Sequence, residues 1–425
     1  MEGERQGIFY GWAVVAAVLV TLSVTSGLGF YNASVILRTA VKELDTSVTA
    51  VSGATALFFG ISGLTGFVFS RFLDRVDIRW FYLAGGVLGA ASLTSLRWVD
   101  SVPKLYVFFA LFGTSFAAGG LVPATTLIAR WFHRRRSVAL SVASSGLSIG
   151  GILLTPLAVK LIDDKGLADA GPWMGLAWIL GVIPIAMFVL RSSPAEKGLE
   201  PDGDPTPPEP VPVDGVRFTA AVSTRFFQFL SATYALVFLA QVGALAQLFN
   251  LVDERIGVDA AARALQVLAA SSVIGRLGGG LVVTKVPTKA LTLVLVLVQA
   301  AALSLIAISD STGPILAASA LFGLSVGNLL MLQPLLLVET FGVKDYSRIY
   351  SLNQLMGTIG VAGGPLLLGY LREISDYRAA FLIGACLNVA GFVALVLAGG
   401  VDAARNEAKE RDLDAPVGSV QSASA

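Results

Sequence analysis

The chain has 425 residues, of which 55% are hydrophobic and 14% charged, and its formal net charge is +1. Soluble domains carry about 25% charged residues, so this composition excludes an ordinary soluble protein and indicates a membrane-embedded one. The near-neutral charge gives no sign of a nucleic-acid partner. The single cysteine, Cys386, excludes an intrachain disulfide, and the single histidine, His133, leaves no material for a metal site or a Ser-His-Asp hydrolase. We therefore expect neither an enzyme nor a cofactor.

Long apolar stretches give the predicted helices. Twelve follow one another, and each has at least 17 residues, enough to cross about 30 Å of hydrocarbon at about 1.5 Å per residue. In chain order they are Gln6–Leu37, Thr46–Ser70, Trp80–Leu96, Leu105–Ala129, Ser137–Val159, Ala170–Leu190, Phe226–Val252, Ala264–Thr284, Ala290–Ser309, Ser311–Val338, Ile349–Leu371 and Ala379–Val401. The predicted fold class is an all-α integral membrane protein with twelve transmembrane helices.

Lysine and arginine are unevenly distributed between these helices. With the N-terminus inside the cell, the inner segments hold 19 of these residues and the outer segments hold 10. Positive residues in short loops favour the cytoplasmic side. The sequence therefore predicts a multi-pass protein of the plasma (inner) membrane with both termini in the cytoplasm.

A polar segment divides the helices into two groups of six. Residues 192–217 are rich in proline and acids, so we expect a solvated cytoplasmic linker. It separates an N-terminal half (1–191) from a C-terminal half (218–401), which a cytoplasmic polar tail (402–425) follows. Two six-helix halves related by a pseudo-two-fold axis suit a site at mid-membrane that opens alternately to either side.

Arg276 is the one charged residue within the twelve stretches, near the middle of Ala264–Thr284. A cation at that depth costs at least about 2.5–3.5 kcal/mol, so it needs a water-filled cavity and an anionic partner. The sequence offers no nearby acid, and a guanidinium holds a carboxylate through two parallel hydrogen bonds. We therefore expect Arg276 to anchor a small carboxylate. The alternative is a structural cation bound to helix C-terminal carbonyls.

Small residues accompany Arg276 and the helix expected to face it. We interpret them as helix-contact surfaces that meet across the two halves, because small side chains let backbones approach closely. They are Ser144, Ser145, Ser148 and Gly151 on one helix, and Gly275, Gly278, Gly279 and Gly280 on the other.

The loop between the second and third helices resembles a known family motif. Its sequence, Ser70-Arg71-Phe72-Leu73-Asp74-Arg75-Val76-Asp77-Ile78-Arg79, is similar to the Gly-x-x-x-Asp-Arg-x-Gly-Arg-Arg loop of the major facilitator superfamily. Both glycines and one arginine of the motif are replaced. With twelve spans and a linker at half-length, the resemblance covers nearly the whole chain. It implies an alternating-access secondary transporter, and the residues expected to control gating are Asp74, Arg75, Arg79 and Arg130.

Narrower motifs resemble the monocarboxylate and oxalate/formate transporter branch of that family. They are Tyr10-Gly11-Trp12, Arg130-Trp131-Phe132-His133-Arg134-Arg135-Arg136, Gly275-Arg276, Phe341-Gly342 and Gly363-Gly364-Pro365. The resemblance implies that Arg276 binds substrate. Oxalate carriers of this branch have a lysine on the eleventh helix, which Ile349–Leu371 lacks, so a monocarboxylate is favoured. Many animal members have an aspartate where Ser272 stands, which weakens the case for a proton relay. Proton symport, anion exchange and uniport stay open.

Polar residues on the predicted helices are candidates to bind the rest of the substrate. The candidate substrate-binding set is Arg276, Tyr31, Asn32, Gln241, Gln247, Ser272, Asn328 and Asn353. The expected partners are a small-molecule carboxylate, the lipid bilayer and, if transport is coupled to them, protons. We expect no metal and no nucleic acid, and a monomer.

Two other functions stay open. An exporter of a lipophilic or drug-like solute in the same superfamily would have an apolar, aromatic-rich cavity. A non-transporting membrane sensor is expected to carry a larger soluble domain than these short tails.

Overall fold

The protein is described by a computed structural model covering residues 9–46, 48–73, 75–204 and 214–414. Nearly all of this part is helical, and its only β-bridge is an isolated one between Gly215 and Gly342. The first group of helices is α1 (Gly11–Thr25), the π-helix η1 (Ser26–Tyr31), α2 (Asn32–Glu43), α3 (Val48–Leu73), α4 (Ile78–Ser95), η2 (Leu96–Trp98), α5 (Val102–Ala118), α6 (Leu121–Trp131) and α7 (Arg136–Phe188). After η3 (Pro194–Lys197) and η4 (Pro201–Gly203), the second group is α8 (Phe218–Val222), α9 (Arg225–Arg255), α10 (Val258–Val282), α11 (Thr288–Ile308), α12 (Thr312–Phe341), α13 (Tyr346–Ile374), α14 (Tyr377–Leu397) and α15 (Val401–Asp414).

Ten segments of the described chain are long and apolar enough to cross a membrane. One of them, α7, has 53 residues, and its helix is interrupted at Gly166, where a φ of 75° lies in the left-handed region that glycine adopts readily. It is therefore long enough for two crossings. Counting α7 twice and adding α4, which packs beside α7, brings the ten segments into agreement with twelve transmembrane helices. The predicted all-α membrane fold is confirmed. The predicted gap between the fifth and sixth spans is helical except at this glycine.

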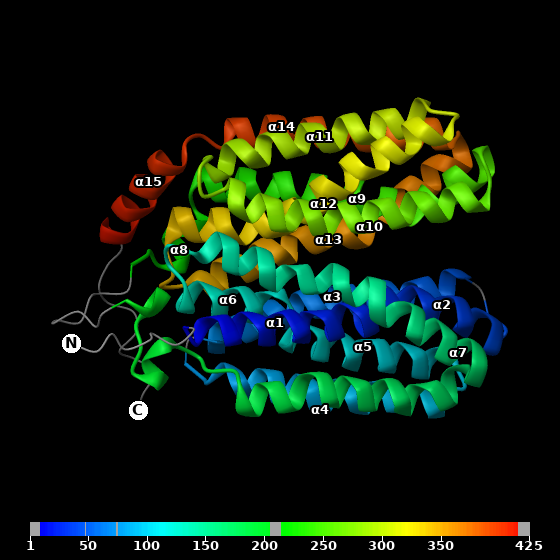
Figure 1. Ribbon diagram of the computed structural model, residues 1–425, viewed down its shortest axis with the longest axis horizontal. Coiled ribbons are helices and arrows are strands. Elements are labelled where there is room, and N and C mark those ends of the chain that lie inside the picture. Colours follow the sequence, from blue (N-terminus) through cyan, green and yellow to red (C-terminus); the bar gives the residue numbers. More distant parts are fainter. Residues whose placement is uncertain (1–8, 47, 74, 205–213, 415–425) are drawn as a thin grey trace, which may run out of the picture.

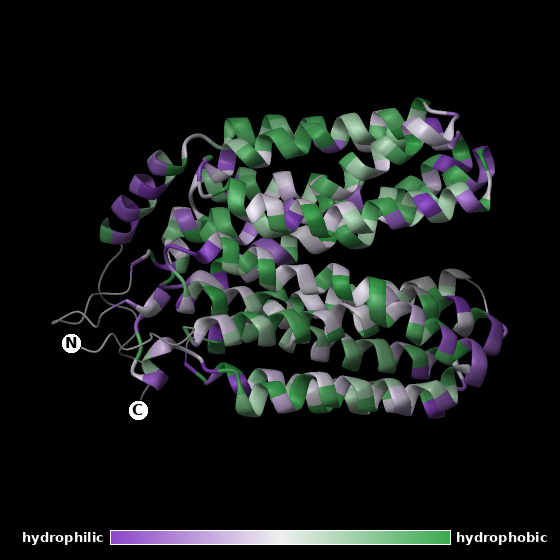
Figure 2. Ribbon diagram, viewed as in Figure 1, coloured by the Kyte–Doolittle hydropathy of each residue, from purple (hydrophilic) through white to green (hydrophobic). Residues whose placement is uncertain are grey.

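Two bundles lie side by side in Figure 1, with α1–α7 in the lower one and α9–α14 in the upper one. We call the end where α7 finishes and α9 begins the linker end, and the end that contains Gly166 the far end. Hydrophilic residues gather at both ends and hydrophobic ones between them (Figure 2). This distribution is the one expected of helices that cross a lipid bilayer.

Two helix pairs make most of the contact between the bundles, α3 with α13 and α7 with α10, and α7 with α12 and α6 with α13 add to it. The first two pairs rely on small residues. A Cβ on Gly280 of α10 would lie 2.4 Å from the Cβ of Ser141 on α7, and one on Gly63 of α3 would lie 2.8 Å from the Oγ1 of Thr358 on α13. We call these contacts the α7–α10 seam and the α3–α13 seam. Of the small residues expected to meet across the halves, Gly280 and Ser148 do so at the α7–α10 seam, whereas Gly275 and Gly279 pack on α12 and Gly151 on Tyr31, each within its own half.

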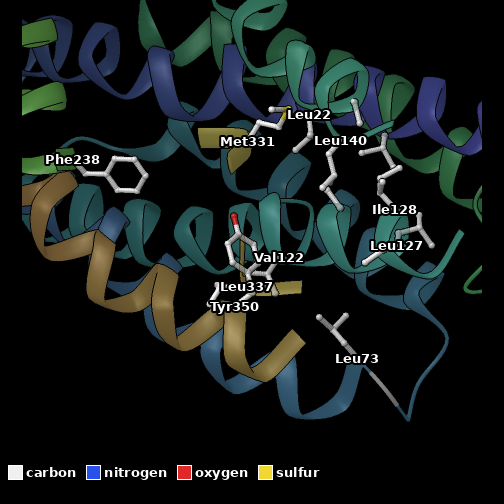
Figure 3. Close-up of a cluster of buried hydrophobic side chains, with 14 of the residues drawn as sticks. Leu22, Leu73, Val122, Leu127, Ile128, Leu140, Phe238, Met331, Leu337 and Tyr350 are labelled. Atoms are coloured by element: carbon white, nitrogen blue, oxygen red, sulfur yellow. The ribbon is translucent and has the colours of Figure 1, made fainter. Parts of the chain in front are cut away.

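The buried apolar core is divided unequally. One continuous core fills the first bundle and extends into the linker end of the second, whereas the far end of the second bundle has a separate core. Figure 3 shows part of the shared core, in which Leu73 and Leu127 of the first bundle belong with Leu337 and Tyr350 of the second. The two halves are therefore sealed together by apolar packing at the linker end.

The described parts of the linker are held against the bundles, residues 192–204 against the first and residues 214–217 against the second. The carboxylate of Asp202 accepts hydrogen bonds from the backbone N–H groups of His133 at 2.8 Å and Arg134 at 2.6 Å. The Ser192 hydroxyl donates to Asp77 at 2.8 Å. On the C-terminal side, α15 packs on α8 and α12, and the Nε of Arg217 donates to Asp412 at 2.5 Å.

Candidate functional site: a central cavity and a buried arginine

A cavity of about 190 Å³ lies between the two bundles. Helices of both bundles line it, with η1, α3 and the α5–α6 junction on one side and α9, α12 and α13 on the other. Its lining includes Ser351, whose hydroxyl is 2.7 Å from that of Ser70 across the α3–α13 seam. Below this contact, towards the linker end, the shared apolar core begins. The cavity is thus closed towards the linker.

Arg276 lies beside this cavity, at the junction of α7, α10 and α12. Only 1% of the residue is exposed, and no other charged residue with a described side chain is buried in this way. Its Nε donates to the carbonyl of Gly327 on α12 at 2.8 Å, and its Nη1 donates to the carbonyl of Ser144 on α7. Gly327 directly follows Val326, which lines the cavity, and Ser144 lies one helical turn before Leu147, which also lines it. The guanidinium is therefore held by two carbonyl oxygens from different halves.

Glycines bring the three backbones close enough for this arrangement. A Cβ on Gly327 would lie 2.1 Å from the carbonyl oxygen of Ser272, one turn before Arg276. The Ser272 hydroxyl in turn lies 3.2 Å from that of Ser148 on α7, and the hydroxyl of Ser141 donates to the carbonyl of Arg276. Without side chains at the glycine positions, α10 sits deep in the groove between α7 and α12.

Four further candidate residues lie around the cavity and the arginine. Tyr31 and Gln241 line the cavity, and Tyr31 is within electrostatic range of Arg276. Ser272 forms the hydroxyl contact across the α7–α10 seam. Asn328 packs against Gly279 one turn after Arg276, and its Nδ2 donates to the carbonyl of Leu324 at 2.8 Å. The structure thus brings together residues that are up to 297 positions apart in sequence, from Tyr31 to Asn328.

The other three candidates lie away from the cavity. Asn32 is buried against Met174 of α7, with 3.3 Å between its Nδ2 and the sulfur. Asn353 accepts from Gln333 at 2.5 Å and donates to Ser231 at 2.7 Å, so both its polar atoms are bonded inside the second bundle. Gln247 lies at the far end in a polar hollow together with Asp253, Glu254 and Arg372.

The proposed gating residues lie at the linker end of the first bundle. Asp74 falls outside the described residues, and Arg75 is exposed. Arg130 donates from its Nη2 to the carbonyl of Leu73 at 3.0 Å, which satisfies a carbonyl at the end of α3. Arg79 pairs with Asp77 and lies 3.4 Å from Glu196 of the linker.

Asp77 begins α4 and ties it to the linker. Its carboxylate accepts from the backbone N–H of Arg79 at 3.0 Å and from the Ser192 hydroxyl at 2.8 Å. Burial raises the pKa of Asp77, but hydrogen bonds from the Arg79 side chain and backbone and from Ser192 outweigh it and lower the pKa to about 2. The loop is therefore fixed by an ionised carboxylate.

Sequence reasoning missed the aromatic lining of the cavity. Phe30, Phe59, Phe116 and Phe238 all face it together with Tyr31. Phenylalanine is common throughout this chain, with 24 copies, so its positions alone do not mark a site. The neighbouring pair Phe30 and Tyr31 is no clear signal either, because the pair Phe108 and Phe109 is buried in the core; only the structure shows that Phe30 and Tyr31 lie in the π-helix η1. Such local widenings of a helix are frequent at functional sites.

Two bundles of membrane-spanning helices around a central cavity define a polytopic membrane protein built like a solute carrier. The sequence profile of the Major Facilitator Superfamily matches residues 19–336 and 289–423. The chain belongs to the Major Facilitator Superfamily.

Individual relatives agree with this assignment. The chain is 25% identical to monocarboxylate transporter 11 of Mus musculus over 400 residues, which cover 90% of this chain and 86% of the relative. It is 26% identical to the oxalate:formate antiporter of Oxalobacter formigenes over 199 residues, 46% of each chain. The crystal structure of the human organic anion transporter MFSD10 (TETRAN) superposes with a TM-score of 0.67 at 15% identity, covering 93% of this chain and 100% of that one. The predicted resemblance to the monocarboxylate and oxalate/formate branch is confirmed.

Proposed function

We propose that the protein is an alternating-access carrier of a small organic anion, a monocarboxylate, and that Arg276 binds the carboxylate. One observation carries the proposal. A fully buried guanidinium lies beside the central cavity, and among the described residues only carbonyl oxygens accept its hydrogen bonds. A carbonyl has a partial charge, so it compensates a buried cation less well than a carboxylate does.

The carbonyl partners suggest how binding is coupled to movement. A guanidinium has five N–H donors, and a carboxylate takes two of them in parallel. A substrate carboxylate that displaces the Ser144 carbonyl from Arg276 removes one of the hydrogen bonds that hold α7 to α10. Substrate binding would thereby loosen the contact between the halves, as a carrier requires if its ligand is to favour the change of orientation.

Charge counting favours a monoanion. None of the described residues that line the cavity is charged, and Arg276 is the one buried cation among them or beside them. A monoanion leaves the loaded site near neutral, whereas a dianion leaves a net negative charge in a medium of low dielectric. The resulting preference is for a monocarboxylate over oxalate.

The arrangement of charge supports one orientation in the membrane. The linker end holds the loops that carry most of the lysine and arginine, including Arg134, Arg135 and Arg136, so we place it in the cytoplasm of the plasma (inner) membrane. The shared apolar core closes that side, so the present conformation is the one with its cytoplasmic gate shut.

A second candidate is an exporter of lipophilic solutes. The phenylalanines that line the cavity favour it, because an apolar lining can bind an uncharged ring without any help from Arg276. The two candidates differ in whether the solute must carry a negative charge.

Counterflow of radiolabelled lactate, pyruvate, formate and oxalate into proteoliposomes tests the proposal. Arg276→Ala loses the charge and Arg276→Lys loses only the planar fork, so we expect at least a tenfold loss of monocarboxylate transport in both. Arg263→Ala is the matched control, since Arg263 lies on the same helix but is exposed and donates only to its own helix, at Asp259.

Insertion of each variant is checked by size-exclusion chromatography after extraction. Wild-type uptake by a well-inserted Arg276→Ala protein would refute the anchor. Tighter binding of oxalate than of any monocarboxylate at neutral pH would refute the charge counting.

A further inference from the structure

We propose that the preferred substrate carries a ring or a branched apolar body next to its carboxylate, so that aromatic and branched-chain monocarboxylates are favoured over formate, acetate and oxalate. This inference rests on the proposed function, because it concerns the part of the substrate that Arg276 does not bind.

An aromatic wall forms one side of the cavity. The ring of Phe30 in η1 lies 5.1 Å from that of Tyr31 and 5.5 Å from that of Phe59 on α3, both in edge-to-face geometry. These contacts fix the rings relative to one another, and all three line the cavity. Fixed rings offer a preformed apolar surface that pairs well with another ring or with a branched alkyl group.

The opposite side of the cavity is also apolar. Phe238 and Leu245 of α9 line it, together with Val326 of α12 and Val361 of α13. In Figure 3 the Phe238 ring stands apart from the other labelled side chains of the shared core. A solute between these two sides meets hydrocarbon on both faces. Formate has no apolar group to place there and would leave the walls in contact with water or empty.

Tyr31 connects the aromatic wall to the cation. Its ring packs over Gly151 of α7, where a Cβ would lie 2.7 Å from the ring. Gly151 is one turn from Ser148, which contacts Ser272 at the α7–α10 seam. The wall and Arg276 therefore adjoin, so one molecule can reach both if its carboxylate is separated from its apolar body by a short chain.

The remaining polar groups of the lining are hydroxyls and amides. Gln241 is the clearest of them, because it is 2% exposed and its Oε1 accepts no hydrogen bond from any described residue. An uncharged lining of this kind does not compensate a second negative charge, but it tolerates a hydroxyl or keto group beside the carboxylate. This distribution matches an acid with one charged head, a small polar neighbour and an apolar tail.

The test compares ligands of one charge and different bodies on purified protein in proteoliposomes. We expect 3-phenylpropionate and 4-methylpentanoate to compete for binding at least tenfold more strongly than formate, acetate or oxalate. The neutral 3-phenylpropanamide, with the same ring and no charge, is expected to bind at least tenfold more weakly than 3-phenylpropionate.

Variants of the wall show whether it causes the preference. Phe59→Ala is expected to reduce the ratio of 3-phenylpropionate to acetate affinity at least fivefold while acetate changes less than twofold. Phe59→Leu keeps the volume if the alanine variant fails to fold, and should give a smaller change of the same sign. Phe188→Ala, at a 72% exposed position on the outside of α7, should leave the ratio unchanged.

The possible outcomes separate the two claims. One outcome is that acetate or formate binds as tightly as 3-phenylpropionate, and that Arg276→Ala abolishes the binding of every acid. The apolar-body proposal is then overturned and the carboxylate carrier stands. If the neutral amide binds as well as the acid and Arg276→Ala changes nothing, the proposed function fails. If no carboxylate of the panel binds, both fail.

Discussion

The two seams between the halves bury different chemistry. At the α3–α13 seam the hydroxyl of Ser351 lies 2.7 Å from that of Ser70, and the Ser347 hydroxyl donates to the Ser70 carbonyl at 3.1 Å. The α7–α10 seam has comparable serine contacts and, in addition, the guanidinium of Arg276. Hydroxyls and glycines are sufficient to close one seam, so closing the other does not by itself require a buried cation. This difference favours a ligand-binding role over a structural one.

The largest difference between the seams is expected when one methyl group is added to each, by replacing a glycine with alanine. An added Cβ at Gly280 meets the Cβ of Ser141, which cannot move without its backbone, whereas at Gly63 it meets the terminal Oγ1 of Thr358. We expect Gly280→Ala to destabilise the protein by about 1–3 kcal/mol and to reduce transport strongly. Gly63→Ala should cost clearly less. Thermal unfolding in detergent and counterflow measure both; equal effects of the two variants would contradict the view that the α7–α10 seam is the more constrained.

Removing one hydroxyl from each seam should have a smaller effect. Ser351→Ala loses the contact to Ser70, and Ser141→Ala loses the donor to the Arg276 carbonyl. Each hydrogen bond contributes about 0.5–1.5 kcal/mol net to stability. Each variant should therefore raise the ratio of molecules with an open linker end to those with a closed one by up to about tenfold.

Spin labels at the exposed residues Arg135 and Lys344, in a Cys386→Ala background, report this opening as a longer distance between the two halves. If the double variant Ser141→Ala/Ser351→Ala shows no change in the distance distribution, the hydroxyls do not hold the linker end shut.

The smallest effect is expected just beyond the α3–α13 seam, at Asp77. Its pKa of about 2 lies below the value of about 3.9 for an unfolded chain, so its stabilising contribution is complete above about pH 4 and is lost as the pH falls from about 4 towards 2. Asp77→Asn keeps an oxygen that can cap α4 but loses the charge that pairs with Arg79, so it should cost less than about 1 kcal/mol at neutral pH.

Hydrogen exchange of the Ile78 and Arg79 amides measures this contact directly, because these amides donate to Ser192 and Asp77. Protection should be constant from pH 5 to 8 after correction for the intrinsic rate. Asp100→Asn, at an exposed carboxylate paired with Lys104, is the control. A loss of protection already between pH 7 and 5 would show that another group governs the loop.

Much of the fold follows from the sequence because lipid imposes a simple rule. Backbone groups must be satisfied within the helix, so charge-free stretches of sufficient length predict helices directly. The rule does not apply to polar segments outside the hydrocarbon, where water can also satisfy backbone groups. Residues 160–169 contain five charged side chains, yet they are helical up to a single glycine. The contact between Asp202 and the His133–Arg135 backbone depends on two segments far apart in the chain, which no local pattern predicts.

The site was predictable in part. Arg276 stands out because a charge at mid-membrane is costly wherever it faces. For uncharged polar residues the sequence gives the depth but not the rotation of the helix. Gln241 faces the cavity, whereas Asn353 turns inward to Gln333 and Ser231. The sequence alone does not distinguish a polar side chain that is hydrogen-bonded within its own bundle from one that faces the cavity.

The apolar core shared by the halves gives the carrier a thermal response. Opening the linker end would bring side chains such as Leu73 and Leu337 into water. Newly hydrated apolar surface raises the heat capacity by about 0.45 cal/K/mol per Å². In the proposed exchange between two orientations, this contribution makes the equilibrium curve with temperature, and because apolar contacts weaken on cooling, it favours the open linker end in the cold. The side chains that shut the gate also make its resting position a function of temperature.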